Sequence, residues 1–354
     1  MRKLPLLWRI RISRPGLFEA RELWNQRKRR MQAVGQKTIL DTIGNTPLVE
    51  ILHMNANPKV RVMAKLEGNN PGGSVKDRIA LSMIEGAEAR GELKPGMTIL
   101  EATSGNTGIG ISLVAACKGY RNILTMSEGV SIERRRVLSA LGAEIILTPE
   151  NHGTDGAILE ARKMLEENPG SYYMPDQFNN PDNIRAHFMG TGPEIWDQTG
   201  GEIDYFVAGM GTTGTLMGVS RYLKTRKPSV TIVGVEPVMG HKVQGLKNMS
   251  EAIVPGIYVP GELDVKVVVE DEEAYEASKT LASREGIFAG MSSGAAVKAA
   301  LDLARELESG TIVTLLPDRG DRYITTVLYC NERCKTAECR VEHCRECPGL
   351  TASP

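Results

Sequence analysis

The chain has 354 residues, of which 41% are apolar and 24% charged, and its formal net charge at pH 7 is zero. A chain of this length can form one large α/β unit or two domains with a sizeable core. No apolar run is long enough to cross a bilayer, so the sequence predicts a soluble protein with no membrane partner. The zero net charge gives no argument for a nucleic-acid partner.

The first thirty residues are strongly basic. They hold ten lysines and arginines against two glutamates, a net charge of +8, so residues 31–354 sum to −8. Three interpretations of segment 1–30 stay open. The first is a transit peptide, which the many arginines favour and the single serine does not. The second is an arm that binds nucleic acid or lipid. The third is a start codon placed too early, with Met31 as the true first residue. In each case we expect an extension that adds no face to the core.

From Thr38 onward, short apolar runs alternate with helical stretches. The runs predict strands over 61–66, 98–100, 123–126, 144–147, 205–208, 231–235 and 311–316, and helical spacing predicts helices over 79–87, 109–117 and 132–141. This order is typical of parallel sheets with helices on both faces. Ligands of such sheets bind at the carboxyl ends of the strands.

A lysine follows a glycine-rich turn near the start of the first of these helices. Residues 71–73, Pro-Gly-Gly, interrupt regular structure, and Ser74 is a candidate N-cap. Lys76 would then lie in the first helical turn, where the partial positive charge of the helix end disfavours a protonated amine. A neutral amine can act as a nucleophile or form a Schiff base.

Two polar loops each follow a strand-like run and precede a helix. Residues 103–108, Thr-Ser-Gly-Asn-Thr-Gly, offer hydroxyls, an amide and backbone N–H groups that suit a carboxylate. Residues 209–215, Gly-Met-Gly-Thr-Thr-Gly-Thr, let the backbone close around a phosphate while the threonines add donors. The spacing is neither that of a P-loop nor that of a dinucleotide fingerprint, which argues against ATP and NAD. A lysine, a carboxylate seat and a phosphate seat together fit pyridoxal phosphate.

Five of the six cysteines lie in the last 25 residues, together with a histidine. Cys117 alone lies in the body of the chain, on an apolar helix face, where we expect a buried and unreactive thiol. The tail spacing fits no established zinc or iron–sulfur pattern, and two interpretations stay open: a small metal or redox site, or a disordered, reduced tail. The tail residues are Cys330, Cys334, Cys339, His343, Cys344 and Cys347.

Five motifs, taken in order, resemble those of the cysteine synthase family, a family of fold-type II pyridoxal-phosphate enzymes. They are PGGSVKDR, TSGNTG, DQFNNPDN, GMGTTGT and GMSSGA, and the similarity runs from about Thr38 to Tyr329. Segments 190–196 and 318–323 resemble the B-type branch, the O-acetylserine and O-phosphoserine sulfhydrylases. The resemblance implies an α/β fold with two open, twisted, mostly parallel sheets flanked by helices and the cofactor in the cleft between domains.

The resemblance also implies a domain division. Residues 31–67 and 181–329 would form a large domain that binds pyridoxal 5'-phosphate, and residues 68–180 a smaller substrate-binding domain. The tail 330–354 lies beyond both, and the family does not account for it.

The activity implied is that of a cysteine synthase. O-acetyl-L-serine or O-phospho-L-serine would lose its leaving group to give α-aminoacrylate, and a sulfur nucleophile, sulfide or thiosulfate, would add to form L-cysteine. The expected enzyme is a cytoplasmic homodimer that binds small molecules and neither nucleic acid nor membrane. A related lyase, either cystathionine β-synthase-like or a serine or threonine dehydratase, is the alternative from the same structural class. A non-enzymatic module that binds a phosphate ligand is a third interpretation.

The resemblance assigns roles residue by residue. Lys76 would bind the cofactor covalently and then remove the α-proton. Ser292 would meet the pyridine nitrogen, with Ser293 as the neighbouring candidate, and Lys247 stands where phosphoserine-using members have an arginine. Asn106 would hold the ring hydroxyl, Gly211, Thr212, Thr213, Gly214 and Thr215 the phosphate, and Thr103, Ser104, Gly105, Thr107 and Gln177 the substrate carboxylate.

Overall fold

The computed structural model describes residues 38–329, which belong to one compact unit, Gln36–Pro354. The basic segment 1–30 and the cysteine-rich tail, with its candidate metal ligands, lie outside the described residues. No helix in the described part of the chain is long and apolar enough to cross a membrane.

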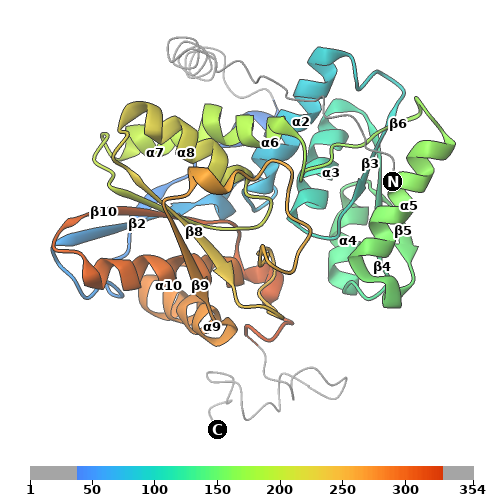
Figure 1. Cartoon of the computed structure of the whole chain (residues 1–354). Coiled ribbons are helices and arrows are strands. Elements are labelled where there is room, and N and C mark those ends of the chain that lie inside the picture. The colour runs from blue at the N-terminus through green and yellow to red at the C-terminus, as the bar shows by residue number, and fades with distance from the viewer. Residues whose placement is uncertain (1–37, 330–354) are drawn as a thin grey trace, which may run out of the picture. The chain divides into compact units, whose positions relative to one another are not determined.

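The described chain forms two sheets (Figure 1). The larger has six strands in the order β1-β2-β10-β7-β8-β9, and only β1 is antiparallel to its neighbour. Its strands are β1 (Leu48–Glu50), β2 (Val60–Leu66), β7 (Tyr205–Gly209), β8 (Thr231–Pro237), β9 (Val265–Val269) and β10 (Gly310–Leu316). Since β10 lies between β2 and β7, chain segments far apart in sequence end side by side.

The smaller sheet has four strands in the order β5-β4-β3-β6, all parallel. The strands are β3 (Thr98–Ala102), β4 (Arg121–Ser127), β5 (Glu144–Thr148) and β6 (Tyr172–Tyr173). The predicted α/β fold with two mostly parallel sheets is therefore confirmed.

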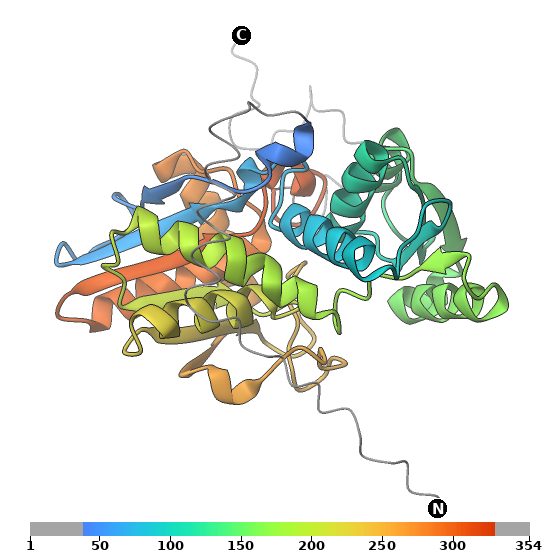
Figure 2. The same cartoon turned by 90° about the horizontal axis from the view of Figure 1, so that it is seen from above.

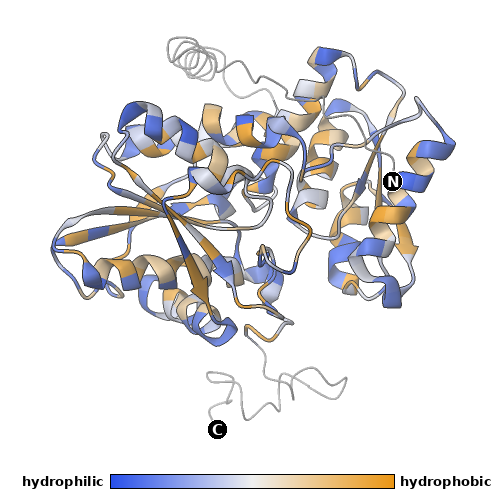
Figure 3. Ribbon diagram, viewed as in Figure 1, coloured by the Kyte–Doolittle hydropathy of each residue, from blue (hydrophilic) through white to orange (hydrophobic). Residues whose placement is uncertain are grey.

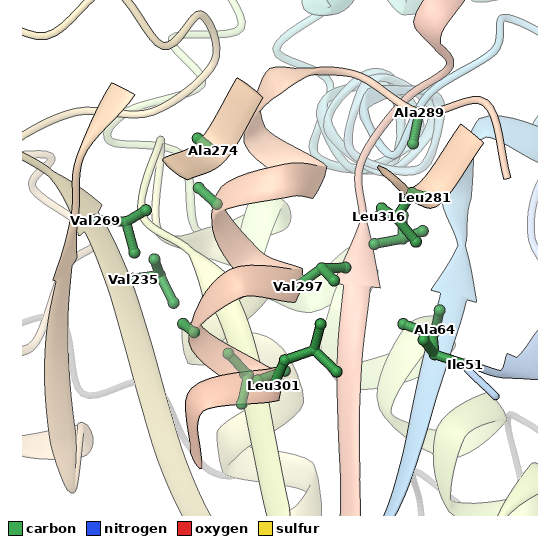
Figure 4. Packing of buried hydrophobic residues seen from close by; sticks show 14 of the residues in the cluster. Ile51, Ala64, Val235, Val269, Ala274, Leu281, Ala289, Val297, Leu301 and Leu316 are labelled. Atoms are coloured by element: carbon green, nitrogen blue, oxygen red, sulfur yellow. The ribbon is translucent and has the colours of Figure 1, made fainter. Parts of the chain in front are cut away.

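Helices cover both faces of the larger sheet (Figures 1 and 2). Alternate residues of a strand point to opposite faces, and Phe206 and Val207 accordingly belong to different apolar clusters. One cluster includes Leu216 of α8 (Gly214–Arg226), and the other, drawn in Figure 4, includes Val297 of α10 (Met291–Glu306). Figure 3 shows mostly hydrophobic strands in the sheet and many hydrophilic residues on the helices around it. The helices are α2 (Lys76–Arg90), α3 (Asn106–Lys118), α4 (Ile132–Ala140), α5 (Gly153–Glu167), α6 (Pro181–Ala186), α7 (Gly192–Gln198), α8 (Gly214–Arg226), α9 (Asp271–Thr280) and α10 (Met291–Glu306).

Two local predictions were wrong. Cys117 is exposed rather than buried, because it lies in the last turn of α3, just before the left-handed Gly119 that ends the helix. Ser74 is not the N-cap of α2. Val75 occupies that position, and the Ser74 hydroxyl accepts the Lys76 N–H at 3.2 Å from one residue further back.

Candidate active site

Lys76 is the first residue of α2, as the sequence predicts. The loop before it is bonded to the end of β10, because the Val75 N–H donates to the Pro317 carbonyl at 2.8 Å and Ser74 forms a bridge with Asp318. Burial lowers the pKa of the Lys76 amine, an effect that the charges of Asp318 and Glu67 oppose. A buried amine whose pKa is lowered has a larger neutral fraction, which is the state that a nucleophile or base requires.

Asp318 is the carboxylate beside this lysine, and sequence reasoning gave it no role. Its Oδ2 accepts hydrogen bonds from the Asn106 amide and the Tyr323 hydroxyl, both at 2.6 Å. Burial raises the pKa of Asp318, against which these two hydrogen bonds act. Arg322 donates to the Asn106 side-chain oxygen and to the Gly72 carbonyl, so it joins the lysine loop to the start of α3. The sequence did contain one indication of a role for Asp318. This residue follows closely after the predicted strand 311–316, and ligands of parallel sheets bind at the carboxyl ends of strands.

The loop 103–107 leads from β3 into α3, whose N-cap, Gly105, provides no side-chain cap. The Thr107 hydroxyl donates to the Gln177 side-chain oxygen at 2.6 Å, so the structure brings together two residues that lie 70 positions apart. Thr103 and Ser104 are half-buried in the same loop. The uncapped N–H groups of the helix end are donors for an anion.

Gln177 lies in a turn whose backbone N–H groups donate hydrogen bonds to a buried carboxylate. Glu101 accepts the N–H of Asp176 at 2.9 Å and that of Gln177 at 3.4 Å. Asp176 has a φ of 50°, a left-handed conformation that is uncommon for residues other than glycine. Burial raises the pKa of Glu101 to about 7. Sequence reasoning missed Glu101, since a single glutamate in an apolar strand carries no recognisable pattern.

The loop 211–215 leads from β7 into α8, and its N-cap, Thr213, has a φ of 66°. A Cβ on Gly211 would lie 2.5 Å from the Gly245 carbonyl oxygen, so only glycine lets these two segments approach. The N–H of Lys247 donates to the Met210 carbonyl at 2.8 Å. The predicted loop is thus held between the end of β7 and the segment around residue 245.

Ser292 and Ser293 both lie, buried, in the first turn of α10. The Ser292 hydroxyl would be 3.7 Å from a Cβ on Gly245, the residue that packs on Gly211. The Ser293 hydroxyl is buried and has no hydrogen-bond partner among residues 38–329. Ser292 therefore lies beside Gly245, the residue on which Gly211 packs, and its preference over Ser293 stays a prediction.

The Lys247 ammonium lies 4.8 Å from the centre of the Phe178 ring, a cation–π contact. Phe178 follows Gln177 directly, so Lys247 is brought next to the turn that carries Gln177. Within the described ranges no carboxylate forms an ion pair with Lys247. A half-buried cation without a paired anion is able to meet an anionic group of a ligand.

The residues present fit pyridoxal phosphate. A buried amine of lowered pKa suits the aldehyde, and the N-terminus of α8 with its threonine hydroxyls suits a phosphate. Gly211 packs so closely on the Gly245 carbonyl that no side chain fits between them, which leaves the backbone of this loop uncovered by a side chain at residue 211. Fold and site together therefore define a fold-type II pyridoxal-phosphate enzyme.

The chain matches the family described as pyridoxal-phosphate dependent enzyme over residues 39–318. It is 49% identical over 292 residues to cysteine synthase B of Pseudomonas aeruginosa, covering 82% of this chain and 97% of that protein. Identity to cysteine synthase B of Escherichia coli is 48% over 295 residues, 83% of this chain and 97% of that protein. The chain belongs to the cysteine synthase family, as the motifs predicted.

Solved structures agree with this assignment. Cysteine synthase of Entamoeba histolytica superposes with a TM-score of 0.80 at 40% identity, covering 84% of this chain and 92% of that chain. An O-ureido-L-serine synthase superposes with a TM-score of 0.79 at 41% identity, covering 83% of this chain and 95% of that chain. The chain thus shares its fold with a cysteine synthase and with an O-ureido-L-serine synthase.

Proposed function

We propose that the protein is a cysteine synthase that replaces the activated β-substituent of an O-substituted L-serine with a sulfur nucleophile. The observation that carries the proposal is the convergence of three segments. Lys76 with Asp318, the loop 103–107 with Gln177, and the loop 211–215 with Ser292 are linked by the contacts described above. The similarity to cysteine synthases over most of the chain supports it.

The cofactor, when bound, supplies an electron sink that acidifies the α-hydrogen of the substrate. The chain's own residues would do the rest. The Lys76 amine would hold the cofactor and would accept the α-proton of the substrate at Nζ. The loop 211–215 and the N-terminus of α8 hold the phosphate, and Ser292 offers the pyridine nitrogen a neutral hydroxyl.

The Asn106 amide nitrogen carries two hydrogens, and one of them is donated to Asp318. We assign the second hydrogen to the ring hydroxyl of the cofactor. The loop 103–107 and Gln177 would hold the substrate carboxylate, which fixes the α-carbon next to Lys76. Orientation of this kind lowers the entropic part of the barrier.

An assay of the purified protein tests the proposal. With pyridoxal phosphate, O-acetyl-L-serine and sulfide, we expect formation of L-cysteine without accumulation of a keto acid. Keto-acid release without cysteine would instead assign the chain to the dehydratases. Absence of both products with every serine derivative, from protein that has bound pyridoxal phosphate, would refute the proposal.

Lys247 bears on the choice between acetylserine and phosphoserine. A cation facing a phosphate leaving group gains about 1–3 kcal/mol over one facing a neutral ester. We therefore expect Lys247→Ala to lower kcat/KM for O-phospho-L-serine by about 10-fold or more and that for O-acetyl-L-serine by less. Lys242, an exposed lysine of the same segment, provides the matched control variant Lys242→Ala. Equal losses for both donors in Lys247→Ala would show that Lys247 does not read the phosphate.

We further propose a homodimer in the cytoplasm, with a large domain over 31–67 and 181–329 and a small domain over 68–180. The family resemblance supports the homodimer and its place in the cytoplasm. The division into two domains is supported by the two separate sheets, each built from the strands of one proposed domain. Light scattering coupled to size-exclusion chromatography measures the oligomeric state directly.

A further inference from the structure

Asn183 on α6 touches two of the segments at the site without belonging to either. Its side chain is fully buried. The amide nitrogen donates to the Gln177 carbonyl at 2.8 Å and to the Thr212 hydroxyl at 3.1 Å. The carbonyl can only accept, so the nitrogen of this amide must face it, and both amide hydrogens are used.

These contacts determine what the Thr212 hydroxyl can do. The Thr212 oxygen accepts from Asn183 and, at 3.4 Å, from the Gly214 N–H. A hydroxyl has two acceptor positions and one hydrogen. Since both acceptor positions face donors, the Thr212 hydrogen remains available for donation to a ligand. Asn183 thereby makes Thr212 a donor.

The other hydrogen of the same amide holds the Gln177 turn. That turn carries the side chain bonded to Thr107 and rests on the Glu101 carboxylate. Directly after the end of α6, His187 contacts the Thr215 hydroxyl at 3.2 Å but forms no hydrogen bond with the Gln177 turn in the described part of the chain. Among the residues described, the bonds of Asn183 reach both sides of the site, whereas those of His187 reach one.

We propose that Asn183 is a positioning residue that acts through Thr212 on the cofactor phosphate and through Gln177 on the substrate carboxylate. The inference rests on the proposed function, because it takes both ligands from it. Removing the amide frees the Thr212 hydrogen to turn toward other acceptors and releases the Gln177 carbonyl. Asn183→Asp, which has the same shape, places an acceptor in front of Thr212 and draws its hydrogen away from the phosphate.

The test compares pyridoxal phosphate with pyridoxal, which lacks the phosphate. We expect Asn183→Ala to raise the Kd of the apoprotein for pyridoxal phosphate about 10-fold, the scale of one neutral hydrogen bond, and Asn183→Asp to raise it further. The Kd for pyridoxal should stay within about twofold in both variants. L-serine, followed by the absorbance of the bound cofactor, should bind more weakly to both variants.

A double-mutant cycle separates positioning from general destabilisation. If Asn183 acts through Thr212, the variant Thr212→Val should bind pyridoxal phosphate as weakly alone as together with Asn183→Ala. Asn122→Ala is the matched control, because Asn122 of β4 is also a buried asparagine, and its amide donates to Ser112 of α3, away from Thr212 and Gln177. We expect it to lower the melting temperature without changing the ratio of the two Kd values.

Equal weakening of pyridoxal and pyridoxal phosphate, or full additivity in the cycle, would overturn the inference. If Asn183→Ala does not fold, the isosteric Asn183→Asp and Thr212→Val carry the same comparison. Failure of the proposed function has a different signature. The wild type would then bind pyridoxal phosphate in an Asn183-dependent manner but make no cysteine.

Discussion

Lys76→Ala is expected to abolish turnover and covalent attachment of the cofactor. Loss of the proton transfer alone costs about 10²–10⁴-fold in rate, and loss of the covalent bond adds to it. Among the described residues, Lys65, a lysine whose side chain is fully buried, is not suited to replace the Lys76 amine. Lys65 is buried, but its Nζ is bonded to the Thr46 carbonyl, Glu194 and Gln198 at 2.7–2.8 Å.

Borohydride reduction of the loaded protein, followed by peptide mapping, measures the attachment. We expect the label on the peptide that contains Lys76 and none in Lys76→Ala. Lys94→Ala, a change at an exposed lysine, serves as the control and should keep both label and rate. A label on Lys65 would be incompatible with the ion pair and the two hydrogen bonds described for it and with the assignment of Lys76.

Arg78→Met is expected to lower the free energy of unfolding by about 3–5 kcal/mol, because it removes the positive charge that two buried carboxylates share. Arg78 lies in α2, two residues after Lys76, and bonds Glu67 and Glu194 at 2.6–2.8 Å with all three side chains buried. Burial alone would lower the pKa of Arg78, but the two glutamates raise it overall. Methionine keeps most of the stem and removes only the charge and its donors.

Urea denaturation measures the effect. Arg61→Met removes an exposed arginine paired with Glu50 at 3.1 Å, and we expect it to cost less than about 1 kcal/mol. A loss in Arg78→Met as small as that in Arg61→Met would show that the buried pairs contribute nothing beyond a surface ion pair.

The pH dependence gives an independent check. Burial would raise the pKa of Glu194, but Arg78 and Lys65 hold it below its ordinary value of 4.5. A depressed carboxyl pKa contributes stability above the ordinary value that is lost as the pH falls through the folded-state value. We therefore expect the wild type to lose stability below pH 4.5 more steeply than Arg78→Met does.

Local sequence patterns predicted the segments of the site, because the chemistry of each lies within a few residues. The glycine turn before Lys76 and the strand-to-helix loops at 103–107 and 211–215 are of this kind. The residues that support them could not be predicted in this way. Arg78 and Glu194 are 116 positions apart, and Asn106 and Asp318 are 212 apart. Such pairs follow from the order of strands in the sheets, which local periodicity does not encode.

The same distinction explains the errors. Whether Cys117 is buried depends on where α3 ends relative to the sheet, and not on the apolar residues before it. The burial of Asn183 likewise depends on the packing of α6 against α8, so a polar residue in a polar segment gave no sign of its contacts.

Three buried oxygens, Oδ1 of Asp77 directly after Lys76, of Asn183 and of Asp318, have no conventional hydrogen-bond partner within residues 38–329. Each lies against a glycine, where a Cβ would be 2.4 Å away at Gly72 for Asp77, 1.9 Å at Gly214 for Asn183 and 2.3 Å at Gly290 for Asp318. An oxygen in this position can accept a weak bond from the glycine Cα–H. In evolutionary terms each glycine and the residue that carries the oxygen should covary, because any side chain at the glycine displaces the oxygen. We expect related sequences to change both members of a pair together or neither.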